Sequence, residues 1–201
     1  MTSTFYPPHN IGGADLHVKN LADELDKLGH EVHVLHSADA YRMKKGSYGS
    51  GSEQEVENVG KSGVHTHIIE TSLNLSAYVT YFFGAFPPVT KKFKKLVNEI
   101  RPDVVHHHEI SLLGYHILKK VGDYLNLYTA HDYWLICQHG VLPKHEMEIC
   151  LEKRCFHCAL SFNRPPQFWR YADSFRKRIN ELDFIISSSD YLRRRLLEEL
   201  G

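Results

Sequence analysis

Short runs of β-branched residues alternate with helical patterns along most of this chain, and this alternation restricts its fold more than any other feature. The runs that we interpret as strands cover residues 31–35, 64–69, 103–107, 125–129 and 183–187. Helices are predicted at residues 14–28, 89–100, 111–121, 167–182 and 190–200, the last capped by Ser188, Ser189 or Asp190. Such alternation indicates an α/β, Rossmann-like, doubly wound fold with a mostly parallel sheet.

Two features fit this interpretation poorly, and a third supports it. Residues 41–62 are polar and rich in glycine, which predicts a mobile surface loop between the second and third strands. Residues 2–6 give only a stub where a central strand of about 5–6 residues is expected, so the first strand reads as clipped. The apolar runs after Asp103 and Asp183 are typical of strands covered on both faces by helices.

Length and charge exclude several classes of protein. The 201 residues suit one domain over residues 1–201, and lysine plus arginine balance aspartate plus glutamate at 24 each. Without a wide basic face we expect no nucleic-acid partner. The sequence shows neither a signal peptide nor a run of about 20 apolar residues that could span a membrane. We therefore expect a cytoplasmic protein.

The turn that ends in Gly12-Gly13 runs directly into an amphipathic helical pattern. Two glycines leave no side chain between the backbone and a ligand, and a helix start exposes unpaired N–H groups. The turn is therefore a candidate anion site, and its alternative interpretation is a tight turn that only introduces the helix.

Two further segments that contain candidate functional residues follow predicted strands. His106-His107-His108-Glu109 ends one strand and His131-Asp132 ends the next. In open α/β sheets, ligands bind beyond the carboxyl ends of strands, so both segments and the glycine turn are expected at one crevice. Strand alternation turns His107 to the other face, and Asp132 can instead cap backbone N–H groups. Bound zinc or iron is an alternative role for these histidines, although no spacing fixes a coordination geometry.

All four cysteines fall in one short segment that ends in a Cys-Phe-His-Cys knuckle. Four thiolates, with His139, His145 or His157 as substitutes, suit tetrahedral zinc, so we predict a structural zinc site. Unligated thiols, disulfides and an iron–sulfur cluster are the alternatives. The predicted zinc ligands are Cys137, Cys150, Cys155 and Cys158.

An aromatic segment precedes a run of lysines. We interpret it as core followed by a solvated helix face, the alternative being a weak contact with a membrane surface or a lipid-linked substrate. The residues are Tyr78, Tyr81, Phe82, Phe83 and Phe86, then Lys91, Lys92, Lys94 and Lys95.

Several segments together carry a resemblance to a known family. They are Phe5-Tyr6-Pro7-Pro8, Gly12-Gly13-Ala14-Asp15, Leu21-Ala22, residues 28–34, residues 101–106, His131-Asp132-Tyr133-Trp134 and residues 186–189. In order and spacing they resemble the N-terminal domain of the retaining glycosyltransferases of family 4, which have the two-domain GT-B fold. The resemblance covers nearly the whole chain.

The resemblance implies transfer of a sugar from a nucleotide diphosphate sugar to an acceptor hydroxyl with retention at the anomeric carbon. By match, the catalytic histidine is His131, which lies beside the donor sugar. Gly12, Gly13 and Asp15 would belong to the donor-phosphate or acceptor side. The remaining matched substrate-binding residues are His106, His108 and Asp132. The family's chemistry usually needs no metal or other cofactor.

The chain also departs from the family's pattern. No glutamate has another eight positions away, the spacing found in the family's C-terminal, nucleotide-sugar-binding domain. We therefore expect that domain to be absent from these 201 residues and to be supplied by the same or a separate chain. The isolated chain is expected to be inactive. A non-catalytic partner subunit is the first alternative. An NAD-dependent oxidoreductase is less well supported, because the turn lacks the Gly-x-Gly-x-x-Gly spacing.

Overall fold

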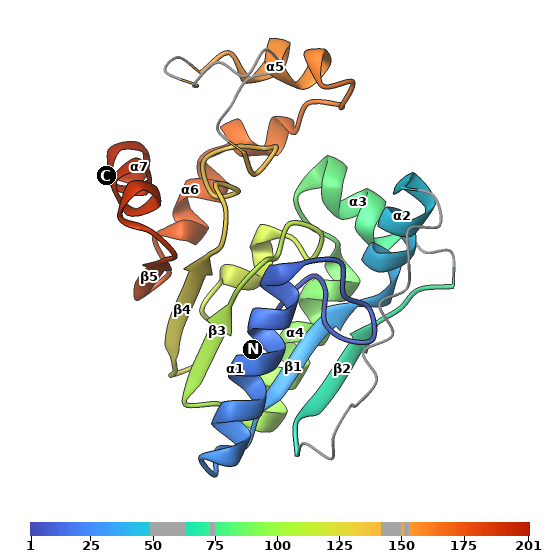
Figure 1. The fold of residues 1–201 in the computed structure, drawn as a ribbon, viewed down its shortest axis with the longest axis vertical. Coiled ribbons are helices and arrows are strands. Elements are labelled where there is room, and N and C mark those ends of the chain that lie inside the picture. Colours follow the sequence, from blue (N-terminus) through green and yellow to red (C-terminus); the bar gives the residue numbers. More distant parts are fainter. Residues whose placement is uncertain (49–62, 73–74, 142–149, 151–152) are drawn as a thin grey trace.

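Parallel strands form the centre of the protein in a computed structural model, which describes residues 1–48, 63–72, 75–141, 150 and 153–201 (Figure 1). Each predicted strand is confirmed, with ends that differ by at most two residues. The strands are β1 (His33–Ser37), β2 (His65–Ile69), β3 (Val104–His107), β4 (Leu125–Ala130) and β5 (Phe184–Ser187).

Residues 1–4 occupy the central strand position. Thr2 forms parallel bridges with Leu35 of β1 and with His107 of β3. The Ser3 N–H donates to the Leu35 carbonyl at 3.0 Å, and the His108 N–H donates to the Thr2 carbonyl at 3.0 Å. The spatial order is therefore β2, β1, residues 1–4, β3, β4, β5, with every pair parallel. This is the doubly wound order, and its reversal lies between residues 1–4 and β3.

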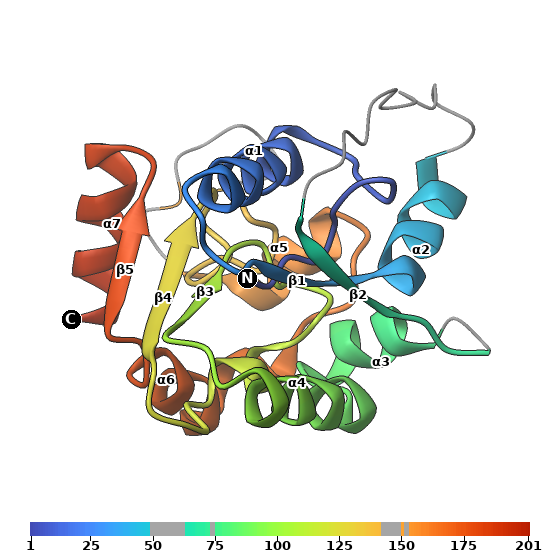
Figure 2. The same cartoon turned by 90° about the horizontal axis from the view of Figure 1, so that it is seen from below.

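Helices cover both faces of this sheet (Figure 2). On one face lies α1 (Gly13–Lys27), whose buried Val18 and Ala22 pack in one cluster with Val34 of β1. On the other lie α4 (Pro87–Ile100) and α6 (Asp173–Ile179), and Phe93 of α4 belongs to the main core. The predicted α/β fold class is thus confirmed.

The predicted end of the helix over residues 14–28 and the predicted cap of the last helix are both confirmed. After α1, Gly29 takes a left-handed φ of 90°, and the His30 N–H donates to the Leu25 carbonyl at 3.1 Å. This pair of features is a Schellman-type stop. At α7 (Asp190–Leu200), the Ser189 hydroxyl accepts from the Leu192 N–H at 3.2 Å and is the N-cap.

The predicted helix over residues 111–121 is wrong, because only a 3₁₀ turn, η1 (Tyr115–Leu118), forms there. Gly114 has a φ of 92°, and a Cβ at this position would lie 2.6 Å from the Gly84 carbonyl oxygen. The close backbone contact holds the chain in a conformation that a helix cannot continue.

The predicted helix over residues 167–182 is divided. A 3₁₀ turn, η2 (Phe168–Tyr171), is followed by α6, and Ala172 between them has extended backbone. Of the predicted loop over residues 41–62, the first part belongs to α2 (Ala38–Tyr48), and residues 49–62 lie outside the described residues.

Helix α3 (Ser76–Phe83) was not predicted, and it packs beside α2 through a buried polar contact. The Asp39 carboxylate of α2 accepts from the hydroxyls of Thr71 and Ser76, each at 2.6 Å. The aromatic segment on α3 is not all core, because Tyr78, Phe82 and Phe83 are 49–71% exposed. The interpretation of this segment as core is therefore wrong for these three side chains.

The expectation that apolar strands are covered on both faces is also wrong for β5 and for the first residue of β3. Phe184 and Ile186 of β5 are 62% and 46% exposed, and Val104 of β3 is 45% exposed. Helix α1 lies over β1 and the centre of the sheet, so it does not reach β5 (Figure 2).

Among the helices in the described part of the chain, none combines the length and apolar composition of a membrane span.

Candidate functional site

The ends of β3 and β4 bring distant histidines together at the carboxyl edge of the sheet. Side chains alternate along a strand, so His106 and His108 share one face and His107 points to the other. His107 Nδ1 hydrogen-bonds to the Thr2 hydroxyl at 2.7 Å, and its ring packs near Phe93 of α4. The predicted division of the three histidines is confirmed, and His107 has a structural role.

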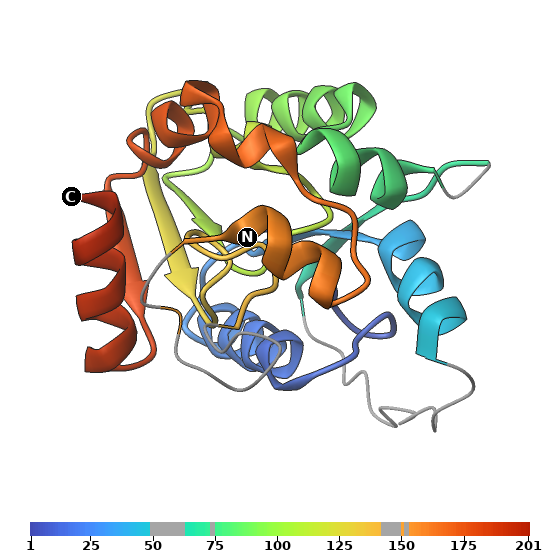
Figure 3. The same cartoon turned by 90° about the horizontal axis from the view of Figure 1, so that it is seen from above.

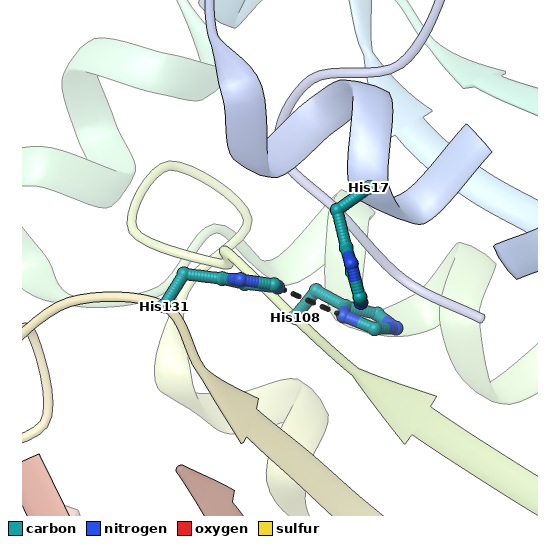
Figure 4. A group of neighbouring side chains, drawn as sticks. All are labelled: His17, His108 and His131. Atoms are coloured by element: carbon teal, nitrogen blue, oxygen red, sulfur yellow. Dashed lines mark hydrogen bonds between the residues drawn. The ribbon is translucent and has the colours of Figure 1, made fainter. Parts of the chain in front are cut away.

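His108 and His131 meet across the two strand ends, with 3.1 Å between His108 Nδ1 and His131 Nε2 (Figure 4). The His106 ring lies beside His108, with 4.1 Å between ring centroids. His106 Nε2 hydrogen-bonds to the Thr129 hydroxyl of β4 at 2.7 Å. Three of the predicted site histidines therefore form one connected cluster.

His17 also belongs to this cluster, and the sequence reasoning missed it. Its ring approaches His131 edge-on, with centroids 5.0 Å apart, and lies 6.0 Å from the His108 ring (Figure 4). One ligand nitrogen from each of the three rings lies within 4.8 Å of the others. Since His17 stands four residues after Gly13, one helical turn, its spacing from the glycine turn was the available signal.

Burial favours the uncharged form of His106, His108 and His131 at neutral pH. It lowers the pKa of His106 to about 4 and also lowers the pKa of His108 and of His131. A neutral imidazole has one N–H donor and one acceptor nitrogen. The cluster can therefore bind hydroxyl groups, and its three converging rings are also of the type that ligates transition metals.

The glycine turn is organised by Asp15, which is buried in the first turn of α1. Its Oδ2 accepts from the N–H of Ile11 at 2.7 Å and of Gly12 at 2.9 Å. Gly13 and Ala14 stand in the first turn, where no carbonyl of the helix can pair with their N–H groups. A Cβ built on Gly13 meets nothing within 4 Å, so this backbone borders open space. Gly13, more than Gly12 or Asp15, thus offers a donor to an anion.

Asp132 follows the capping alternative. Its Oδ1 accepts from the Trp134 N–H at 2.8 Å. Gly140 has a left-handed φ of 71°, and a Cβ there would lie 2.8 Å from Asp132 Oδ2. Glu109 is likewise turned into its own loop, where it accepts from the Ser111 N–H at 3.0 Å. These contacts give both carboxylates partners in their own loops.

Cys155 and Cys158 lie near the same edge, on α5 (Cys155–Ser161), which stands above the sheet (Figures 1 and 3). The Cys137 thiol donates to the Val141 carbonyl at 2.9 Å. In the ranges that the structure describes, the groups of three or more close metal-ligand atoms contain no cysteine. His145 and the stretch around it lie outside those ranges. The zinc site stays a prediction.

A separate cavity of about 310 Å³ lies between the loop after β4 and the helices α6 and α7. None of the histidines of the cluster lines it. On its wall, the Arg170 guanidinium packs over the rings of Trp134, Trp169 and Phe175 and donates to the Trp134 carbonyl at 2.7 Å. Burial lowers the pKa of Arg170 to about 10. Arg170 therefore ties the loop that follows His131 to α6.

The sequence model of Glycosyltransferase Family 4 matches residues 11–201. An uncharacterized 42.6 kDa protein in the cps region of Klebsiella pneumoniae is 26% identical over 156 residues, which are 76% of this chain and 41% of that protein. The chain thus spans about two fifths of the relative's length. With the doubly wound fold and the histidine cluster at its carboxyl edge, the family match over nearly the whole sequence shows that this chain belongs to glycosyltransferase family 4.

Proposed function

We propose that this chain is the acceptor-side, N-terminal domain of a retaining glycosyltransferase that moves a sugar from a nucleotide diphosphate sugar to an acceptor hydroxyl. The observation that carries the proposal is the convergence of the α1 N-terminus, His108 and His131 at one edge of the sheet. This edge borders the reversal of strand order, where ligands bind in open α/β sheets.

The backbone at Gly13 would face the donor diphosphate. Its N–H stands at the positive end of the α1 dipole, and no side chain blocks approach. As the bond between sugar and phosphate breaks, negative charge grows on the leaving phosphate. A fixed N–H donor stabilises that charge without reorganisation. Asp15 would act indirectly, by holding the turn in place.

His131 would orient a hydroxyl of the donor sugar and stabilise the charge that develops at the reacting carbon. Its Nε2 is committed to His108, so Nδ1 is the polar atom left for the sugar. Because the His131 ring is neutral, it can hydrogen-bond to a hydroxyl without adding a net charge to the site. His106 and His108 would line the acceptor side, and Asp132 would shape the loop that carries His131.

A second, nucleotide-binding domain would form the other wall of the cleft, in the same or a separate chain. The family's paired glutamates are not found in these 201 residues. The isolated chain would therefore not transfer sugar. The reaction of the two-domain enzyme would need no cofactor. We further propose that it works in the cytoplasm.

The exposed side of α3 would support weak contact with a membrane that carries a lipid-linked acceptor. Tyr78, Phe82 and Phe83 are exposed there, and α3 lies beside the lysine-bearing α4 (Figure 2). Aromatic rings with nearby cations are typical of membrane-surface binding. Co-sedimentation with anionic vesicles should then decrease when Phe82 and Phe83 are replaced by serine, and binding unchanged by these substitutions would contradict the contact.

Sugar transfer tests the main proposal directly. The chain would be joined to, or mixed with, a matching C-terminal domain, and release of nucleotide diphosphate measured with a panel of nucleotide sugars and acceptors. Proton NMR of the product would report the anomeric configuration, which should be retained. Complex formation without transfer from any donor would instead favour the non-catalytic subunit. Tight NADH binding would favour an oxidoreductase.

A further inference from the structure

A second group of histidines gathers at the start of β1 and β2. His33 and His65 are direct partners in the parallel ladder, and His67 stands two residues further along β2 on the same face. The His33 ring stacks on both, with centroid distances of 4.7 Å to His65 and 5.2 Å to His67. Glu31 completes the group, because its Oε1 lies 2.9 Å from His33 Nε2. We name these four residues the strand-start cluster.

The strand-start cluster lies far from the candidate active site along the strands. It stands at the amino ends of β1 and β2, whereas His108 and His131 follow the carboxyl ends of β3 and β4. Because all these strands are parallel, the two groups lie at opposite edges of the sheet (Figure 1). The proposed sugar chemistry gives the strand-start cluster no role.

The donor atoms of this cluster are spaced as ligands of one ion. Glu31, His33 and His65 each offer one atom, and the three atoms lie within 4.8 Å of one another. Zinc binds nitrogen and carboxylate oxygen at about 2.0–2.2 Å, so neighbouring ligand atoms of a tetrahedral ion lie roughly 3.3 Å apart. His33 Nε2 and Glu31 Oε1 lie at a hydrogen-bond distance of 2.9 Å, so a small separation of the two atoms would bring them to this spacing.

His67 supplies the outer partner that such a site needs. His33 Nδ1 lies 2.9 Å from His67 Nε2. If His33 Nδ1 carries the proton and donates to His67, the lone pair of His33 Nε2 is left to face Glu31. Two acceptors then face each other, and a cation between them resolves the repulsion. Metal-bound histidines commonly use their second nitrogen in this way, to fix the ring's tautomer and orientation.

We propose that Glu31, His33 and His65 bind a divalent transition metal ion such as zinc, with His67 positioning the His33 ring. Two imidazoles and one carboxylate are a donor set that zinc accepts, and a fourth position would hold water. The ion would join the starts of β1 and β2. It would thereby stabilise β2, which pairs with β1 alone among the strands that the structure describes.

Zinc binding to the whole 201-residue chain tests this proposal. The parent protein carries His17→Ala and His131→Ala, to remove the competing histidine cluster, and its thiols are alkylated before titration. Equilibrium dialysis with elemental analysis should find one zinc fewer in His65→Ala than in this parent. Glu31→Gln, at a position whose side chain is 75% exposed and safe for folding, should weaken binding as well.

Two variants sharpen the result. His30→Ala, at an exposed position beside the cluster, should keep the parent's stoichiometry and affinity. His67→Gln should retain the zinc but bind it about tenfold or more weakly, as expected of an outer partner. Equal zinc stoichiometry and affinity in the parent, His65→Ala and Glu31→Gln would overturn the site. Because sugar transfer is not measured, the result is independent of the proposed function.

Discussion

His108 and His131 share a hydrogen bond across 23 residues of sequence, with 3.1 Å between Nδ1 of His108 and Nε2 of His131. Two neutral rings joined in this way share one proton, so the tautomer of each ring determines that of the other. The buried His108 therefore decides what the half-buried His131 presents to a ligand. Loss of either ring should therefore change the hydrogen bonding of the ring that remains.

Replacement of His131 by alanine is expected to lower turnover far more than stability. In the two-domain enzyme, kcat should fall about 100-fold or more, the usual cost of losing a group that stabilises transition-state charge. The free energy of unfolding should fall by only about 1 kcal/mol, because one partly buried hydrogen bond is lost. Steady-state kinetics and urea denaturation measure the two effects. His30→Ala is the control, and equal kcat in the two variants would contradict the role of His131.

Asp15→Ala is expected to destabilise the turn before α1. The substitution leaves the N–H groups of Ile11 and Gly12 without their acceptor and removes an N-terminal cap. Loss of such a cap costs about 1–2 kcal/mol. Asp15→Asn keeps an acceptor oxygen and should recover part of the loss. Glu24→Ala removes the exposed pair with Lys27 on the same helix and should cost under about 1 kcal/mol. A urea midpoint for Asp15→Ala that matches Glu24→Ala would disprove the cap.

Buried His36 of β1 is expected to make the protein sensitive to acid. Burial lowers its pKa from 6.5 to about 4, so below pH 6.5 the unfolded chain binds a proton that the folded chain does not. Stability should therefore fall as the pH drops from about 6.5 to 4, by roughly 2 kcal/mol at pH 5. His36→Leu should lose this share of the pH dependence, whereas exposed His30→Gln should not. Urea denaturation at pH 7.5 and 5.0 measures the free energy of unfolding. An equal loss of that free energy between the two pH values in wild type and His36→Leu would refute the assignment.

Local sequence pattern was sufficient for most of the fold, and contacts between distant segments account for the errors. Strand positions, the end of α1 at Gly29 and the N-cap of α7 at Ser189 depend on near neighbours, so they could be predicted. The central strand was expected only as a stub at residues 2–6, because the pairing of Thr2 with Leu35 and His107 spans long separations in the sequence. The local pattern of residues 2–6 is too short to indicate a full strand, and the hydrogen bonds to the neighbouring strands on both sides hold this segment in the sheet.

The candidate site was predictable to the same extent. Because the carboxyl ends of parallel strands share one sheet edge, the positions of His106, His108 and His131 in the sequence predict that they lie together. His17 was missed because its helix approaches that edge from one face of the sheet, and its position one helical turn after Gly13 was the only sequence signal for it. The contact of Asp132 is the capping role that the sequence offered as an alternative, whereas the inward contacts of Asp15 depend on the geometry of the glycine turn.

Gly84→Ala is expected to be strongly destabilising. Gly84 has a left-handed φ of 73°, and an added Cβ would lie 2.5 Å from ring atoms of both Trp169 and Tyr115. Backbone strain and overpacking together should cost about 2 kcal/mol or more. Gly46→Ala is the matched control, since it lies in α2 with nothing within 4 Å of its Cβ. That change should be neutral or stabilise by about 0.5–1 kcal/mol. Equal melting temperatures for the two variants would contradict the packing at Gly84.

The cysteine segment is expected to hold one zinc ion per chain. Cys155 and Cys158 lie one turn apart on α5, a spacing that lets both thiolates reach one ion. Elemental analysis should be done on the His65→Ala variant, so that zinc at the strand-start cluster is not counted. Replacement of Cys155 and Cys158 by serine should release the zinc and lower the melting temperature, because metal-binding energy contributes directly to folding. Iron in place of zinc would indicate a cluster instead. A metal-free protein, equally stable with and without these two thiols, would end the prediction.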